Sequence, residues 1–74
     1  MPLSMVYPGQ KVVLKEITWG EKVRRRLEDM GLTEGVSFEM LRGDNRGAYI
    51  INLRGSRLIL GRGMAHKIIV DLAK

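Results

Sequence analysis

The chain has no cysteine, one histidine, two prolines and few aromatic residues. Without cysteine it can form neither disulfide bonds nor thiolate metal sites, and this fits a reducing compartment. No apolar run approaches the roughly 20 residues that a membrane-spanning helix needs. The first residues also lack the basic and apolar regions of an export signal. These absences predict a cytoplasmic protein that does not insert into a membrane.

Residue types for catalysis are equally scarce. A chain of 74 residues has room for one domain, residues 1–74, with a net stability of about 3–5 kcal/mol that leaves little margin for a strained active site. No serine stands in a nucleophile-elbow motif, and His66 is the only histidine that could act as a base. Glu28 and Asp29 are neighbours on a predicted helix and point about 100° apart. The sequence therefore predicts no enzyme, no catalytic residue and no cofactor.

His66 is also a poor candidate for a metal ligand. The carboxylates of Glu16, Asp44 and Asp71 could complete a site, but none is placed at a metal-ligand spacing from it. We expect His66 to be exposed or half-buried beside a turn, and we assign no metal ligand. A metal-responsive module is the weakest of the functions considered.

Short segments of alternating apolar and polar residues predict a small β protein. The expected strands are residues 11–17, 36–41, 48–54, 57–60 and 68–72. Turn residues at 43–47 and 55–56 separate them, and 61–67 should form a single helical or 3₁₀ turn. In the first strand Val12, Leu14 and Ile17 are expected to face inward. Closing such short strands avoids unpaired edges, so the predicted fold is mainly β, an SH3-like, partly open barrel.

One helix is expected after the first strand, from Gly20 to about Met30. Val23, Leu27 and Met30 recur at i, i+4 and i+7, which places them on one helix face. Thr18 and Glu21 fit a capping box at its start, with Gly20 as a rival N-cap.

A glycine is expected to end this helix. Gly31 can adopt the left-handed conformation of a Schellman motif, and Leu32 would then fold back onto Leu27. The helix should therefore stop within a residue or two of Met30.

Basic residues outnumber acidic ones, 13 to 8, which makes the formal net charge +5. Arginines 24–26 lie on the predicted helix, where Glu21–Arg25, Arg24–Glu28 and Arg25–Asp29 are possible i, i+4 ion pairs. The remaining arginines, at 42, 46, 54, 57 and 62, fall near strand ends and turns. Such a charge favours nucleic acid or an acidic protein surface as the partner.

The aromatic residues make nucleic acid the less favoured partner. Binders of single strands stack bases on several exposed rings, whereas this chain has only Tyr7, Trp19, Phe38 and Tyr49. Phe38 is in phase with the core residues of its strand. Trp19, beside Gly20, is the best candidate for an exposed anchor, although it could equally cover one end of the barrel.

Two segments resemble the FeoA family of small cytoplasmic proteins of ferrous iron uptake. Residues 27–35, LEDMGLTEG, followed by Val36, are similar to the LxxMGLxxGxxV segment of that family. Leu60, Ala65, Ile68 and Val70 are similar to its closing LxxxxAxxIxV pattern. Pro8-Gly9 and the hairpin at 47–58 fall where the family has its entry turn and central hairpin. Gly61 departs from the family, since many members have arginine there.

The resemblance implies an SH3-like barrel that assists the membrane transporter FeoB, whose cytosolic part includes a GTP-binding domain. A related barrel forms the C-terminal domain of iron-dependent repressors of the DtxR type. The family motifs consist of packing and turn residues, so no catalytic residue is carried over.

We therefore expect an accessory or regulatory protein that acts by protein contact. The predicted docking residues are Trp19, Arg24, Arg25, Leu32 and Arg62. Pairing into a homo-oligomer is left open, and a basic barrel that binds nucleic acid is the alternative function.

Overall fold

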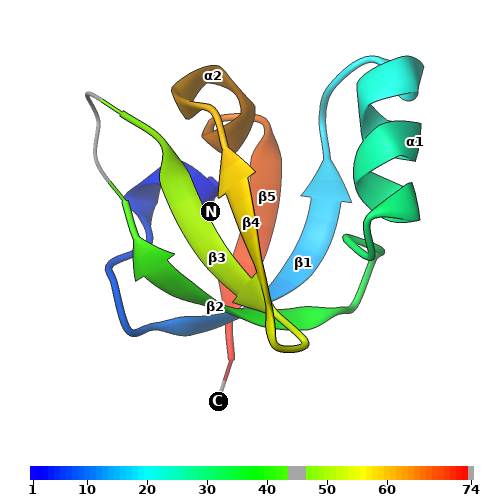
Figure 1. Ribbon diagram of the computed structural model, residues 1–74. Helices are drawn as coiled ribbons and strands as arrows, with labels where there is room; N and C mark the ends of the chain where they lie inside the picture. The colour runs from blue at the N-terminus through cyan, green and yellow to red at the C-terminus, as the bar shows by residue number, and fades with distance from the viewer. Residues whose placement is uncertain (44–46, 74) are drawn as a thin grey trace.

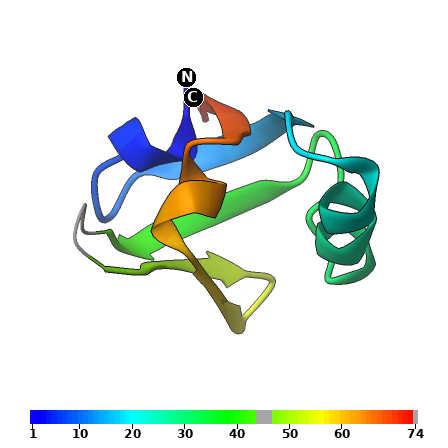
Figure 2. The ribbon, with the colours of Figure 1, turned by 90° about the horizontal axis from the view of Figure 1, so that it is seen from above.

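The computed structural model describes residues 1–43 and 47–73. The elements follow in the order η1 (Leu3–Met5), β1 (Lys11–Ile17), α1 (Glu21–Asp29), β2 (Ser37–Arg42), β3 (Tyr49–Leu53), β4 (Ser56–Leu60), α2 (Arg62–Ala65) and β5 (Ile68–Leu72). The strands form one antiparallel sheet in the order β4-β3-β2-β1-β5 (Figure 1). Seen from above, this sheet curls without closing, and α1 stands at one side (Figure 2). The predicted partly open barrel is confirmed.

The first strand turns the predicted side chains inward. Val12 and Leu14 alternate with more exposed residues, as a strand requires. The pairing with β5 shifts register between Leu14 and Glu16, and this bulge changes the phase of the strand. Ile17 therefore also points into the core, although its spacing from Leu14 is odd.

The hairpin between β3 and β4 turns one residue earlier than predicted. Arg54 and Gly55 occupy its two central positions with φ of 52° and 84°, the signs that a type I′ turn requires. The Asn52 side-chain oxygen accepts a hydrogen bond from the Gly55 backbone N–H at 3.1 Å. Ser56 consequently pairs with Leu53 as the first residue of β4. The predicted turn at 43–47 lies partly outside the described residues, at 44–46.

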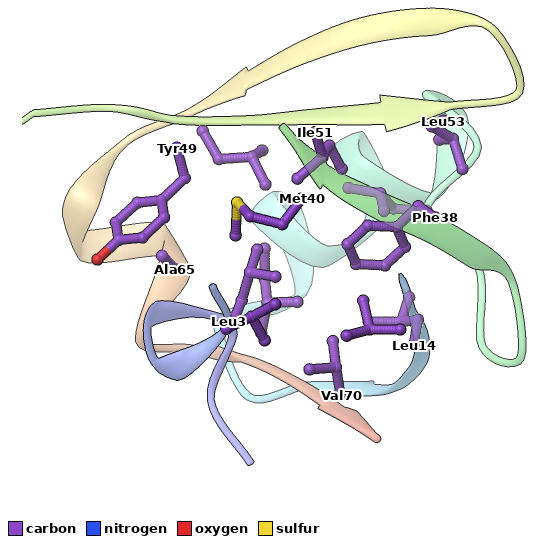
Figure 3. Packing of buried hydrophobic residues seen from close by; sticks show 14 of the residues in the cluster. Leu3, Leu14, Phe38, Met40, Tyr49, Ile51, Leu53, Ala65 and Val70 are labelled. Carbon is purple, nitrogen blue, oxygen red and sulfur yellow. The ribbon is translucent and has the colours of Figure 1, made fainter. Parts of the chain in front are cut away.

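The barrel interior holds a single apolar cluster to which all five strands contribute (Figure 3). Its buried members are Leu3, Val6, Val12, Leu14, Ile17, Leu27, Leu32, Val36, Phe38, Met40, Tyr49, Ile51, Leu53, Leu60, Ala65, Ile68 and Val70. The first two belong to the N-terminal segment, which the periodicity of the sequence did not assign to the core. At β5 the Met1 ammonium donates to the Val70 carbonyl, and the Val70 N–H donates to the Met1 carbonyl, both at 2.7 Å.

The end of α1 is the predicted Schellman motif. Gly31 has φ of 103°, and its N–H donates to the Glu28 carbonyl at 2.9 Å. The Leu32 N–H donates to the Leu27 carbonyl, also at 2.9 Å. These two bonds satisfy carbonyls that the helix itself leaves without partners. Leu32 folds back as expected.

The start of α1 differs from the capping box. Gly20 is the N-cap, with no side-chain hydrogen bond to the helix. Thr18 lies too early and donates its hydroxyl to the Lys67 carbonyl at 3.1 Å. An acceptor that precedes the neighbouring strand β5 has replaced the local one.

Leu27 anchors α1 to the barrel. It is 2% exposed, whereas Val23 is only partly buried. Met30, expected on the same face, is 44% exposed. It is the C-cap residue, one position beyond the end of α1.

We expect Leu27→Ala to destabilise the protein by about 2–4 kcal/mol, because it removes the main core contact of α1 and leaves a cavity. Met30→Ala, at the C-cap of the same helix, is the control and should change the free energy of unfolding by less than about 1 kcal/mol. Urea unfolding followed by circular dichroism measures both. Equal losses for the two variants would contradict this anchoring role.

Gly31→Ala should cost more stability than Gly35→Ala. Both glycines have positive φ, 103° and 87°, so alanine is strained at either position by about 1 kcal/mol. Only at Gly31 would the new Cβ also meet the Leu53 side chain, at 3.2 Å. Thermal unfolding of the two variants isolates that contact, and identical melting temperatures would show that the neighbouring side chain yields without cost.

Candidate functional site

Trp19 lies at the junction of β1 and α1 and is 40% exposed. The residue before it is held by two hydrogen bonds to one acceptor. The Thr18 backbone N–H and hydroxyl both donate to the Lys67 carbonyl, at 2.7 Å and 3.1 Å. The junction is therefore tied to the segment that joins α2 to β5, and Trp19 is held by a defined backbone.

The indole of Trp19 lies next to α2. A Cβ built on Gly63 would be 3.9 Å from its Cη2 atom, which is an ordinary van der Waals contact. Arg62 directly precedes this glycine, so the fold places the backbone of one predicted docking residue close to the ring of another from a distant part of the sequence. We call the surface formed by Trp19, Arg62, Gly63 and Lys67 the Trp19 patch. Its charged members are both basic and its ring is partly accessible, so it suits an acidic partner with an apolar pocket.

Arg24 and Arg25 lie on α1 in the ion pairs that their spacing predicted. Arg24 Nε is 3.5 Å from Glu28 Oε1, and Arg25 Nη2 is 3.2 Å from Glu21 Oε1. The guanidinium of Arg25 therefore pairs with Glu21, toward the start of the helix, and not with Asp29, the third expected pair. All four side chains are largely exposed, and such pairs contribute little stability. Their charges are partly neutralised locally.

Arg24 also borders a groove of about 240 Å³ between α1 and β1. The lining residues are Leu14, Glu16, Ile17, Arg24, Glu28, Leu32 and Glu34. Three glutamates against one arginine make this rim acidic, unlike the chain as a whole. Arg24 therefore belongs to a different electrostatic environment from the Trp19 patch.

Leu32 offers no exposed surface for docking. It is 0% exposed and forms part of the core. The Schellman motif that the sequence predicted is the cause, because it directs this side chain back against Leu27 and into the barrel. The expectation of an exposed Leu32 was therefore wrong, and the buried contact has only a structural role.

His66 is exposed, as expected, at the end of α2. Its Nδ1 is 3.1 Å from Ser4 Oγ in the N-terminal segment. In residues 1–43 and 47–73 no three His, Cys, Asp or Glu side chains gather into a group able to hold a metal ion.

The four aromatic residues divide into two kinds. Phe38 and Tyr49 are buried in the barrel, at 4% and 2% exposure, so they offer no ring for stacking. Tyr7 and Trp19 are exposed, at 74% and 40%, and they lie on separate segments. Two isolated rings do not form the continuous stacking surface typical of single-strand binders.

The helices within the described part of the chain are too short or too polar to cross a membrane.

Thr18→Val should loosen the Trp19 patch. It removes the hydroxyl bond to Lys67, worth about 0.5–1 kcal/mol at this exposed position, and leaves the backbone bond in place. Because Trp19 is the only tryptophan, its fluorescence should shift to longer wavelength as the ring becomes more hydrated. Thr33→Val is the control, since Thr33 is exposed and its side chain makes no hydrogen bond to the described residues. Indistinguishable spectra for the two variants would show that Thr18 does not position the ring.

Comparison with known proteins identifies the family. The FeoA domain model matches residues 1–72. The chain is 37% identical over 73 residues to the "Putative Fe(2+) transport protein A" of Methanocaldococcus jannaschii, covering 99% of this chain and 88% of that protein. A crystal structure described as an iron uptake regulatory protein, FeoA, superposes with a TM-score of 0.90 at 34% identity, covering 99% of this chain and 97% of the other. The IdeR structure from T. acidophilum, with a TM-score of 0.86 at 14% identity, covers 99% of this chain and 34% of that protein and shares the fold alone. The chain belongs to the FeoA family.

Proposed function

We propose that this protein is a cytoplasmic accessory protein of ferrous iron uptake, and that it acts by binding the cytosolic part of a FeoB-type membrane transporter. Membership of the FeoA family supports the role in iron uptake, as does the name of the M. jannaschii relative. The observation that carries the contact is the Trp19 patch. A half-exposed indole is held there between two tied segments beside basic residues.

The composition of the patch suits a protein interface. Tryptophan and arginine are the residue types most often found at the energetic centre of such interfaces, because they bury a large area while keeping a polar edge. Trp19 supplies the apolar anchor, and Arg62 with Lys67 supplies the basic rim. The double hydrogen bond from Thr18 reduces the ordering that binding would otherwise cost.

The net charge of +5 assists the encounter with an acidic surface. Charges outside the buried centre act mainly on the association rate and on its dependence on salt. Arg25, on the exposed side of α1 and paired with Glu21, is suited to this steering. Arg24, at the acidic groove, is expected to contribute less.

Trp19→Ala should weaken binding to the purified cytosolic domains of the cognate transporter by at least about tenfold, because it removes the anchor. Arg62→Glu should weaken it by a similar factor, and Arg25→Glu should mainly slow association at low salt. Surface plasmon resonance with the domains immobilised separates the association and dissociation rates.

Lys11→Glu is the charge-matched control, since Lys11 is exposed at the opposite end of β1 from Trp19. It should retain the wild-type dissociation rate. Undiminished binding by Trp19→Ala and Arg62→Glu together would reject the Trp19 patch as the interface. Binding to RNA or duplex DNA with a steep salt dependence, in place of binding to the transporter domains, would reject the proposed function itself.

A further inference from the structure

The two edge strands of the sheet, β5 and β4, differ in whether the chain covers their outer side. At β5 the N-terminal segment covers the outer edge, through the bridge between Pro2 and Ile69 and the two hydrogen bonds between Met1 and Val70. At the other end, β4 pairs with β3 alone. Throughout residues 1–43 and 47–73 no backbone group is hydrogen-bonded to the outer side of β4. One edge is closed by the chain itself, and the other is left open.

The hairpin geometry identifies the open backbone groups. In a two-residue hairpin the residues flanking the turn, here Leu53 and Ser56, exchange both of their hydrogen bonds. Pairs then alternate along the ladder, so Leu58 bonds to β3 whereas Arg57 and Ile59 do not. The N–H and C=O groups of Arg57 and Ile59 therefore point away from the sheet. They offer four hydrogen-bonding groups to an added strand.

The side chains of the same two residues lie on the outer face of β4. Ile59 is 69% exposed, and its cross-strand neighbour Ile50 is only partly buried. Arg57 is exposed, and within the described residues its guanidinium has no carboxylate partner. The strand has no proline, and its pairing with β3 has no bulge. Native proteins commonly use those devices to block an exposed edge.

We propose that the outer edge of β4 binds an extended segment of a partner protein, which adds antiparallel to Arg57 and Ile59 and extends the sheet by one strand. Main-chain hydrogen bonds would supply the affinity, and the alternate side chains would supply the specificity. The segment should have an acidic residue opposite Arg57 and an apolar residue opposite Ile59, two positions apart. This site shares no residue with the Trp19 patch and stands independently of the proposed function.

Charge favours such a segment over a second copy of this chain. β4 has an arginine and no acidic residue. If two copies of β4 paired through all their outward groups, Arg57 of each would face Ile59 of the other. The two Arg57 side chains would then be diagonal neighbours about 7–8 Å apart on one face. A carboxylate of the partner segment beside Arg57 would replace this repulsion between arginines by an attraction.

The probe is a blocked heptapeptide, Thr-Thr-Val-Thr-Glu-Thr-Thr, titrated into the ¹⁵N-labelled full chain. Binding at the edge should shift the backbone amide resonances of Arg57 and Ile59 and slow their hydrogen exchange severalfold. The hydrogen exchange of the Leu58 amide, which already bonds to β3, should stay unchanged. The same peptide with lysine in place of glutamate should bind at least about tenfold more weakly. Shifts centred on any other surface, or no saturable shift for the acidic peptide, would overturn the proposal.

Three variants test the geometry. Ile59→Pro removes one outward N–H and no bond to β3, so the protein should fold and lose affinity for the acidic peptide by at least about tenfold. Ile59→Val keeps both the N–H and an apolar side chain and should bind as the wild type does. Arg57→Glu should reverse the preference toward the lysine peptide, and it keeps the test decisive if the proline variant fails to fold. A concentration-dependent dimer that Ile59→Pro abolishes would overturn the choice of an acidic partner in favour of a second copy.

Discussion

The packing of apolar side chains in the barrel interior is the interaction on which the rest of the structure depends. A chain of this length buries a limited fraction of its surface, and here each helix and strand, together with the N-terminal segment, contributes at least one buried side chain to one cluster. The buried side chain of Leu27 fixes the position of α1, and that of Ala65 fixes the position of α2. Leu3 and its neighbours hold the N-terminal segment against the outer edge of β5. The exposed features are arranged around that cluster.

The Trp19 patch illustrates how the core positions a functional surface. Ile17 and Ile68 are buried partners across β1 and β5, and immediately beyond them Thr18 meets the Lys67 carbonyl. Trp19 therefore lies beside α2 because β1, which precedes Trp19, is paired with β5, which follows α2. The open edge of β4 arises from the same topology, since the chain passes from β4 through α2 to the opposite end of the sheet. Both surfaces are consequences of how the barrel closes.

Local rules predicted most elements correctly. Alternation identified Val12 and Leu14 of β1 and Phe38 of β2 as inward-facing, and one glycine with the leucine after it identified the end of α1, because a Schellman motif involves only neighbouring residues. Predictions failed where a distant group competed with a near one. Thr18 bonds to the Lys67 carbonyl, which is distant in sequence and precedes the neighbouring strand β5, instead of capping the helix. Leu32 forms the predicted Schellman motif, yet the sequence did not show that this motif directs the Leu32 side chain into the core.

The sequence by itself determined the family, the mainly β fold, the helix after the first strand and the excess of basic charge, because these depend on residue type and short-range spacing. It also named Trp19 and Arg62 among the candidate docking residues, from distant parts of the chain. Only the tertiary structure decided that they share a surface, that Arg24 borders an acidic groove and that β4 has an open edge. Such features depend on which segments meet across the barrel. That outcome is set by the packing of the whole core, and no single stretch of the chain carries it.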